Sequence, residues 1–343
     1  MPILNRRHLM AAAAAAFAVS AMVAAPVAEA QDPDKVVLGA LRFTSHSAGF
    51  IAYEKGYFAE ENLDVSFEFF QAAQPIAVAT ASGDVDFGVA GVTGGLINLA
   101  DKNAIRIVAG VLHEKKGVDG MMIMASNKAY EDGLTSPSEM AGRSLAMTQI
   151  GSSFHYMMKL IADKEDYELS DVKLVPLQKV GSMIGALKSG QVDSMIMVPH
   201  IAKALVNSGA AKEIGWLNDY VEYQISALFT SVKNIENRRD MVERFIRAYA
   251  KGIAEFNRVM LADDADPAER EELTRIIHKY VYTDRPYEKA APPIQAGSMF
   301  LNDGAALNKT GVEAHMQWFK DAGLVTSDIT IDTLVDDSFV EHF

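Results

Sequence analysis

The stretch DVSFEFFQAAQPIAVATASGDVD (64–86) aligns without a gap on DVKLVPLQKVGSMIGALKSGQVD (171–193), at an offset of 107 residues. Each copy contains an apolar run, a polar loop that opens on glutamine, a short helical segment and Ser-Gly-x-Val-Asp before a second apolar run. The chain therefore contains two similar β-α-β units. Two similar lobes that face each other can enclose a small molecule, so the repeat predicts ligand capture. The identical pairs are Asp64/Asp171, Val65/Val172, Gln71/Gln178, Ala79/Ala186, Ser82/Ser189, Gly83/Gly190, Val85/Val192 and Asp86/Asp193.

Strand-like and helical segments alternate on both sides of the repeat. This alternation predicts an α/β fold in which each lobe has a parallel-rich sheet with helices on both faces. The second lobe follows the same order as the first. The expected strands are 35–43, 65–70, 85–90 and 106–112 in the first lobe, and 144–148, 172–177 and 192–198 in the second.

The chain is expected to return to the first lobe after the second is complete. We assign residues 31–124 to lobe 1, 125–222 to lobe 2 and 223–343 to a return segment of lobe 1. Two crossing segments then form a two-segment hinge, which permits closure of the lobes around a ligand. The helix expected at 238–261 has an apolar stripe that should pack on lobe 1. The stripe consists of Met241, Phe245, Tyr249, Ile253, Phe256 and Met260.

Residues 1–30 have the features of a signal peptide. The basic segment 5–10 precedes the apolar run 11–25, and Ala28-Glu29-Ala30 is a small-residue cleavage signal. Paired arginines fit either a twin-arginine or a Sec signal. The run is too short and Ala-rich for a retained membrane anchor. We expect cleavage after Ala30 and a mature protein in the periplasm.

Composition excludes several classes of protein. The chain has no cysteine, which excludes disulfides, Cys-ligated metal, thiol catalysis and a lipid-anchored cysteine. Its net charge is −13, and removal of two arginines and one glutamate with residues 1–30 gives −14. Such a surface repels nucleic acid and anionic lipid. Any bound anion must therefore be held by local donors. We expect a monomer without a cofactor.

The candidate pocket lies in the loops that follow the strands. Ligands of open parallel sheets bind beyond the carboxyl ends of the strands, where helix amino termini present free N–H groups. Applied to both lobes, this rule selects thirteen positions. They are Thr44, Ser45, His46, Gln71, Gly91, Val92 and Thr93 in lobe 1, and Gln149, Gly151, Ser152, Ser153, Pro199 and His200 in lobe 2.

Two glycine-containing loops are the most informative of these positions. Gly151-Ser152-Ser153 combines close backbone approach, two hydroxyls and a following helix, which suits an anion; an ordinary serine helix cap is the alternative. The segment 91–95 (GVTGG) lacks the Gly-Lys-Ser/Thr ending and the glycine spacing of nucleotide-binding loops. We interpret it as a tight strand-to-helix turn with exposed amides.

The sequence offers no convincing metal or catalytic site. His46, His155 and His200 are scattered over both lobes without paired carboxylates, so hydrogen bonding or stacking is the better interpretation for His46 and His200. There is no Gly-x-Ser-x-Gly elbow and no acid–base pair. Asp86 and Asp193 fall at the amino ends of strands, where we expect structural hydrogen bonds. The methionine-rich runs 121–124 and 195–197 are expected to be buried strands, with Met197 near the cleft.

Several motifs resemble one family of transport proteins. AYEKGYF (52–58) with ENLDV (61–65), ASGDVDFG (81–88), ALKSGQVD (186–193) and AYAKG (248–252) resemble the signatures of periplasmic solute-binding proteins of the nitrate/sulfonate/taurine and thiamine-pyrimidine (NMT1/THI5-like) family. The resemblance implies a type II periplasmic-binding-protein fold that delivers its ligand to an ABC permease with a separate ATPase. Asn62 replaces the usual glycine at a position that is expected to be left-handed. The cysteine-rich motif of the pyrimidine synthases is missing, which argues against that enzymatic branch.

Three functional hypotheses follow from these observations. The leading hypothesis is a receptor for a small organic anion, sulfonate-like, carboxylate-like or nitrate-like, gripped by residues 151–153. A receptor of the same fold for a neutral heterocycle, with His46 or Phe43 stacking on the ring, is the first alternative. An enzyme built on this fold is the second alternative, and we expect that the protein is not an enzyme.

Overall fold

The computed structural model describes residues 32–343, so the predicted signal peptide lies outside the described residues. Within residues 32–343, no helix combines the length and apolar character needed to cross a membrane. The helices are α1 (Ser47–Glu54), α2 (Tyr57–Glu60), α3 (Ala73–Ser82), α4 (Gly94–Asp101), α5 (Asn127–Glu131), α6 (Ser153–Lys164), α7 (Val180–Lys188), α8 (Pro199–Asn207), α9 (Val232–Asn237), α10 (Arg239–Phe256), α11 (Pro267–His278), α12 (Tyr287–Ala296), α13 (Lys309–Asp321) and α14 (Ile331–Leu334).

The first sheet belongs to lobe 1 and has the strand order β2-β1-β3-β10-β4. Strand β1 pairs in parallel with β2 and β3, whereas β10 runs antiparallel between β3 and β4. Helices cover both faces of the sheet, as predicted, and the inner strands β3 and β10 are buried on both sides. The strands are β1 (Asp34–Ala40), β2 (Leu63–Phe69), β3 (Phe87–Gly91), β4 (Ile105–Gly110) and β10 (Ser226–Ser231).

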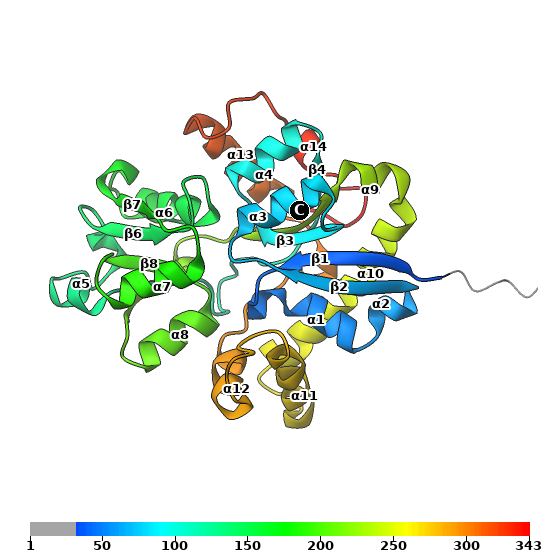
Figure 1. The fold of residues 1–343 in the computed structure, drawn as a ribbon. Helices are drawn as coiled ribbons and strands as arrows, with labels where there is room; N and C mark the ends of the chain where they lie inside the picture. Colours follow the sequence, from blue (N-terminus) through cyan, green and yellow to red (C-terminus); the bar gives the residue numbers. More distant parts are fainter. Residues whose placement is uncertain (1–31) are drawn as a thin grey trace, which may run out of the picture. The chain divides into compact units, whose positions relative to one another are not determined.

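The second sheet repeats this topology in lobe 2, with the order β7-β6-β8-β5-β9. Strand β6 pairs in parallel with β7 and β8, and β5 runs antiparallel between β8 and β9. Figure 1 shows these green elements set apart from the rest of the fold. The strands are β5 (Met122–Ala125), β6 (Ser144–Met147), β7 (Lys173–Pro176), β8 (Ser194–Met197) and β9 (Lys212–Trp216).

The sequence repeat corresponds to two equivalent units, β2-α3-β3 and β7-α7-β8. Their final aspartates make the same hydrogen bond: Asp86 Oδ2 accepts from Val37 N at 2.9 Å, and Asp193 Oδ2 accepts from Ser144 N at 2.8 Å. Each bond ties the residue before β3 or β8 to the neighbouring strand, at Val37 in the middle of β1 or at Ser144, the first residue of β6. The predicted structural role of the two aspartates is confirmed.

The antiparallel strands mark where the chain changes lobe. β5 follows the first crossing, which lies between Gly110 and Met122, and β10 follows the second, between Trp216 and Ser226. A chain that arrives from the other lobe enters the sheet at the cleft end, so its first strand runs opposite to the others. The two crossing segments bond to each other, since Glu114 N donates to Tyr223 O at 3.0 Å. The division of the chain at 124/125 and 222/223 stays a prediction.

Helix α10 packs its predicted stripe against lobe 1. Met241, Phe245, Tyr249, Ile253 and Phe256 are buried, and Phe245 stacks on Phe87 of β3 with a centroid distance of 3.9 Å. The last turn, Asn257–Leu261, is a π-helix in which Met260 is also buried. Asn62, in the turn before β2, has a φ of 55°, so the predicted left-handed conformation is confirmed.

Candidate ligand-binding site

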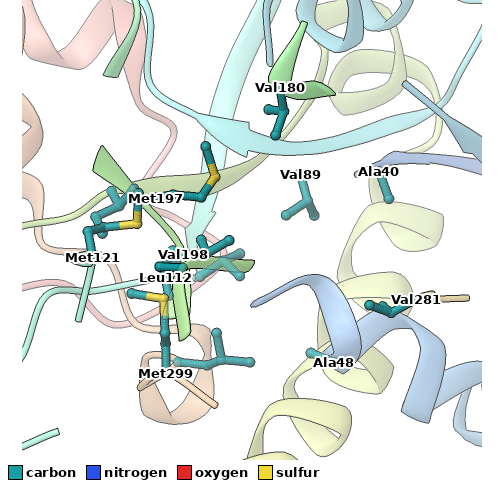
Figure 2. Packing of buried hydrophobic residues seen from close by; sticks show 14 of the residues in the cluster. Ala40, Ala48, Val89, Leu112, Met121, Val180, Met197, Val198, Val281 and Met299 are labelled. Carbon is teal, nitrogen blue, oxygen red and sulfur yellow. The ribbon is translucent and has the colours of Figure 1, made fainter. Parts of the chain in front are cut away.

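A small cavity lies between the two sheets, at the strand ends that face each other across the lobes. It measures about 60 Å³ as the space open to the centre of a water-sized sphere. Four apolar lining residues, Met121, Met197, Val198 and Leu112, lie beside one another in Figure 2. The lining residues are Leu41, Phe43, Ser45, His46, Ala72, Ala73, Gly91, Leu112, Met121, Thr148, Ser152, Ser153, Phe154, Met157, Val180, Met197, Val198, Ile225 and Ser226.

The lining is apolar with a few hydroxyls and one imidazole. Among residues 32–343, no lysine, arginine, aspartate or glutamate lines the cavity. A charged ligand group would therefore be stabilised by backbone dipoles and hydroxyl donors alone. The polar side chains that line the cavity are Ser45, His46, Thr148, Ser152, Ser153 and Ser226.

Ser152 occupies the N-cap of helix α6, at the cavity wall. Its backbone is extended (φ −78°, ψ 166°), yet its side chain makes no cap hydrogen bond. Within the described part of the chain, the buried Oγ has no hydrogen-bond partner at all. The structure therefore does not show the ordinary serine cap, in which Oγ would accept from the helix. A buried hydroxyl without a partner at a helix amino terminus is available to a ligand.

Gly151 does not face the cavity, although the sequence predicted that it would contact the ligand. Its N–H donates to His155 Nδ1 at 3.2 Å, and its carbonyl accepts from Gly94 N of lobe 1 at 2.9 Å. The residue is absent from the cavity lining, which places Ser152 and Ser153 there instead. Its φ of 78° explains the glycine. The loop after β6 thus joins the lobes through Gly151 and faces the cavity through the two serines.

His46 faces the cavity from lobe 1 as a neutral hydrogen-bond donor. Leu41 N donates to its Nδ1 at 3.3 Å, so the ring proton is on Nε2. Burial lowers the pKa of His46 to about 3, which keeps the ring uncharged at neutral pH. The centroid of the neighbouring Phe43 ring lies 5.9 Å from the imidazole centroid, and the two rings are nearly perpendicular, at 83°.

Thr44 and His200 form a buried contact across the lobes behind the cavity. The Thr44 hydroxyl donates to Gly297 O at 2.9 Å, so His200 Nδ1, at 3.0 Å, donates to Thr44 Oγ1. Burial lowers the pKa of His200 to about 3. Its Nε2 is then an unprotonated acceptor, and it has no partner among residues 32–343. Thr44 and His200 hold the lobes together without lining the cavity.

The other predicted residues do not line the cavity. Val92 N donates to Ile225 O at 3.1 Å, and Pro199 is the first residue of α8. Thr93 caps α4 by accepting from Leu96 N at 3.0 Å, so the tight strand-to-helix turn is confirmed. The expected exposed amides are wrong for Val92 and Gly94, whose N–H groups already donate to Ile225 O and Gly151 O. Gln71 is exposed, and Gln149 lines a separate shallow groove against α3.

The structure therefore brings Ser45, His46, Gly91, Ser152 and Ser153 of the predicted set to the cavity. Sequence reasoning missed most of the apolar lining. Leu112 and Met121 lie in the first crossing segment, and Met157 lies inside helix α6. Apolar residues in these places look like ordinary core positions, so no sequence signal marks them. The exceptions were Met197, at the end of β8, and Phe43, which the sequence predicted as a stacking residue.

A metal centre has no support in the described chain. Among residues 32–343, no group of three or more histidine, aspartate or glutamate side chains is arranged to hold a metal ion. His46 and His200 are both engaged through Nδ1, by Leu41 N and Thr44 Oγ1 respectively.

Comparison with known proteins places the fold among periplasmic binding proteins. The family model described as NMT1/THI5 like matches residues 43–257. The alkanesulfonate-binding protein SsuA from Xanthomonas axonopodis, bound to MOPS, is 15% identical over 90% of this chain and 100% of its own, with a TM-score of 0.70. The nitrate-binding protein NrtA from Synechocystis is 13% identical over 88% of this chain and 84% of its own, with a TM-score of 0.66.

An enzyme also shares the fold. The desulfurization enzyme DSZB is 14% identical over 89% of this chain and 97% of its own, with a TM-score of 0.58. Comparison of the sequence with curated proteins gives no match. Binding proteins predominate among the similar structures, and the chemistry of the site must be argued from its own residues.

Proposed function

The chain belongs to the NMT1/THI5-like family, and from this membership we propose that it is the solute-binding receptor of an ABC importer that captures a small organic anion between its lobes. The observation that carries the proposal is the unpartnered, buried Ser152 hydroxyl at the amino terminus of α6, inside the cavity. A helix amino terminus favours negative charge, and hydroxyls can donate to sulfonate or carboxylate oxygens. The apolar wall opposite suits the organic part of such a ligand.

An anion can bind here without a basic side chain. Hydrogen bonds from neutral donors to a charged acceptor are worth about 1.5–3 kcal/mol each, roughly twice a neutral pair. Ser152 and Ser153 lie beside each other at the start of α6, and Thr148 lines the same wall of lobe 2. The net charge of the protein, −13, makes such local donors necessary.

Closure of the lobes would couple binding to transport. Gly91 at the end of β3 lies so near Ser153 of lobe 2 that a Cβ built on Gly91 would be 2.8 Å from Ser153 Oγ. The cavity is thus enclosed by residues of both lobes, and a ligand favours the closed form through contacts that only this form provides. The closed form would then be presented to the permease.

The cellular setting follows from the same proposal. We propose that the protein is exported through residues 1–30, is cleaved after Ala30 and acts in the periplasm as a monomer. It would serve a permease with a separate ATPase, in keeping with the solute-binding proteins that the chain resembles. We propose binding without catalysis. Among residues 32–343, His46 is the only side chain in the cavity wall whose ordinary pKa lies near neutral pH, and burial lowers this pKa to about 3.

Calorimetry on the mature protein, first unfolded and refolded to remove carried-over ligand, tests the proposal. The panel contains alkanesulfonates, short carboxylates, nitrate and neutral pyrimidines. Ser152→Ala should weaken binding of the anion tenfold or more, since a hydrogen bond to a charged group is lost. Ser182→Ala, an exposed serine on α7, is the matched control and should bind like the wild type. Binding of neutral or cationic compounds alone, or an unchanged affinity of Ser152→Ala, would refute the anion receptor.

A further inference from the structure

We infer that the ligand is a short organic monoanion with a second, uncharged hydrogen-bond acceptor, such as a keto or amide carbonyl, and that His46 Nε2–H recognises this acceptor. The inference rests on the proposed function and narrows its ligand class. It follows from the two polar ends of one cavity: the serines of α6 on lobe 2, and His46 on lobe 1.

His46 is restricted to the donor role by its surroundings. Its Nδ1 already accepts the Leu41 N–H at 3.3 Å, so the ring cannot offer that nitrogen to a ligand. The ring is buried, with 4% of its surface exposed, and the Phe43 ring packs edge-on against it. The remaining polar group, Nε2–H, needs an acceptor. A ligand that left this N–H unpaired in the closed cavity would bind more weakly, because the full desolvation penalty of the buried donor would count against binding.

The second ligand group should be uncharged. A second anionic group would lie in the same small cavity as the first, and no lysine or arginine among residues 32–343 lines that cavity to offset the repulsion between the two charges. An ammonium group, as in a zwitterion, would find no carboxylate in the same lining. Burial of an unpaired charge is far more costly than burial of a carbonyl.

The size and wall of the cavity define the rest of the ligand. A water-sized group needs about 10–15 Å³ on this measure, so about 60 Å³ holds roughly four to six such groups. The wall between the two ends consists largely of apolar side chains, including Met121, Met157 and Met197. Methionine side chains adapt to short aliphatic groups. Inorganic nitrate would fill one end and leave His46 unpaired.

The lobes also require a ligand with two polar ends. A ligand stabilises the closed form only through contacts that it makes in that form and lacks in the open form. An anion bound to α6 alone would leave lobe 1 without a polar contact. The acceptor for His46 supplies one, and so joins ligand recognition to closure.

Calorimetry with paired ligands tests this inference. Butanoate and 2-oxobutanoate, pentanoate and 4-oxopentanoate, and a short alkanesulfonate with its oxo analogue differ only in the acceptor. Wild type should bind the preferred oxo compound several-fold, up to about tenfold, more tightly than its partner, as one added neutral hydrogen bond predicts. The preference should be the same at pH 6 and pH 8, because a neutral donor does not titrate there.

His46→Phe keeps an aromatic ring beside Phe43 and removes the donor, so the preference should fall to about one. His46→Gln offers an N–H and should restore part of it. If His46→Phe does not fold, the ligand pairs on wild type decide the question alone. Anions that bind wild type without any preference for the oxo partner, or a preference that survives in His46→Phe, would overturn the inference and leave the receptor proposal standing. If no anion binds at all, the proposed function fails and the inference with it.

Discussion

Replacement of Glu114 by glutamine should stabilise the protein relative to wild type, by an amount that increases as the pH rises. Glu114 lies in the first crossing segment and is fully buried. Its Oε1 accepts from Met121 N at 2.7 Å, whereas Oε2 has no partner among residues 32–343. Gly120 packs against that oxygen, and any Cβ there would overlap it. Burial raises the pKa of Glu114 from 4.5 to about 7, although the Met121 N–H opposes the change.

The size of the effect follows from this pKa. Each tenfold change in proton affinity corresponds to about 1.4 kcal/mol, so a carboxyl whose pKa rises from 4.5 to about 7 on folding loses about 3 kcal/mol at high pH. The folded protein holds the proton more tightly than the unfolded chain. The contribution of the Glu114 carboxyl to the free energy of unfolding of wild type is therefore complete below pH 4.5 and is lost as the pH rises through 7. Above that pH the loss does not grow further. Glutamine carries no such dependence.

Urea unfolding at pH 5, 6, 7 and 8 measures the effect as the difference between Glu114→Gln and wild type. The difference is needed because burial lowers the pKa of His46, His200 and His315 to about 3, and these groups destabilise wild type as the pH falls below 6.5. We expect the difference to move by up to about 3 kcal/mol in favour of glutamine between pH 5 and pH 8. Glu131→Gln, at an exposed glutamate of α5, should give a flat difference. A flat difference for Glu114→Gln as well would refute the reasoning.

Three further predictions concern closure and the core. Gly91→Ala should weaken ligand affinity about tenfold by calorimetry, because its Cβ would lie 2.8 Å from Ser153 Oγ when the lobes are closed; an unchanged affinity would contradict this close contact. Asp193→Ala should lower the free energy of unfolding by about 1–3 kcal/mol in urea titrations, because Ser144 N and Oγ lose their acceptor at 2.8 and 2.7 Å; a loss below the error of the titration would rule out that role. His315→Phe should raise the melting temperature in scanning calorimetry, since it keeps the stack on Tyr156 at 3.9 Å and removes two buried ring nitrogens that have no partner in the described chain; a lower melting temperature would show that the nitrogens are paired.

Much of the fold could be predicted from local patterns. The repeated Ser-Gly-x-Val-Asp elements, the period of the apolar runs and the stripe on α10 depend on contacts between neighbours in sequence or on one face of one element. Asp86 and Asp193 make their equivalent bonds because the two units repeat the same strand spacing. The antiparallel direction of β5 and β10 was not in these patterns, because strand direction depends on which lobe the chain comes from.

The amino-acid sequence by itself determined the two similar lobes, the loops at their strand ends and the absence of cysteine chemistry. Tertiary structure alone decided which polar groups remain free for a ligand. Gly94 N of lobe 1 bonds to Gly151 O of lobe 2 and Thr44 joins His200 across 156 residues of chain, whereas the Ser152 hydroxyl is left without a partner in the described residues. Such pairings depend on the angle and separation of the lobes, which bring together atoms that no local pattern relates, and the methionine wall of the cavity forms for the same reason.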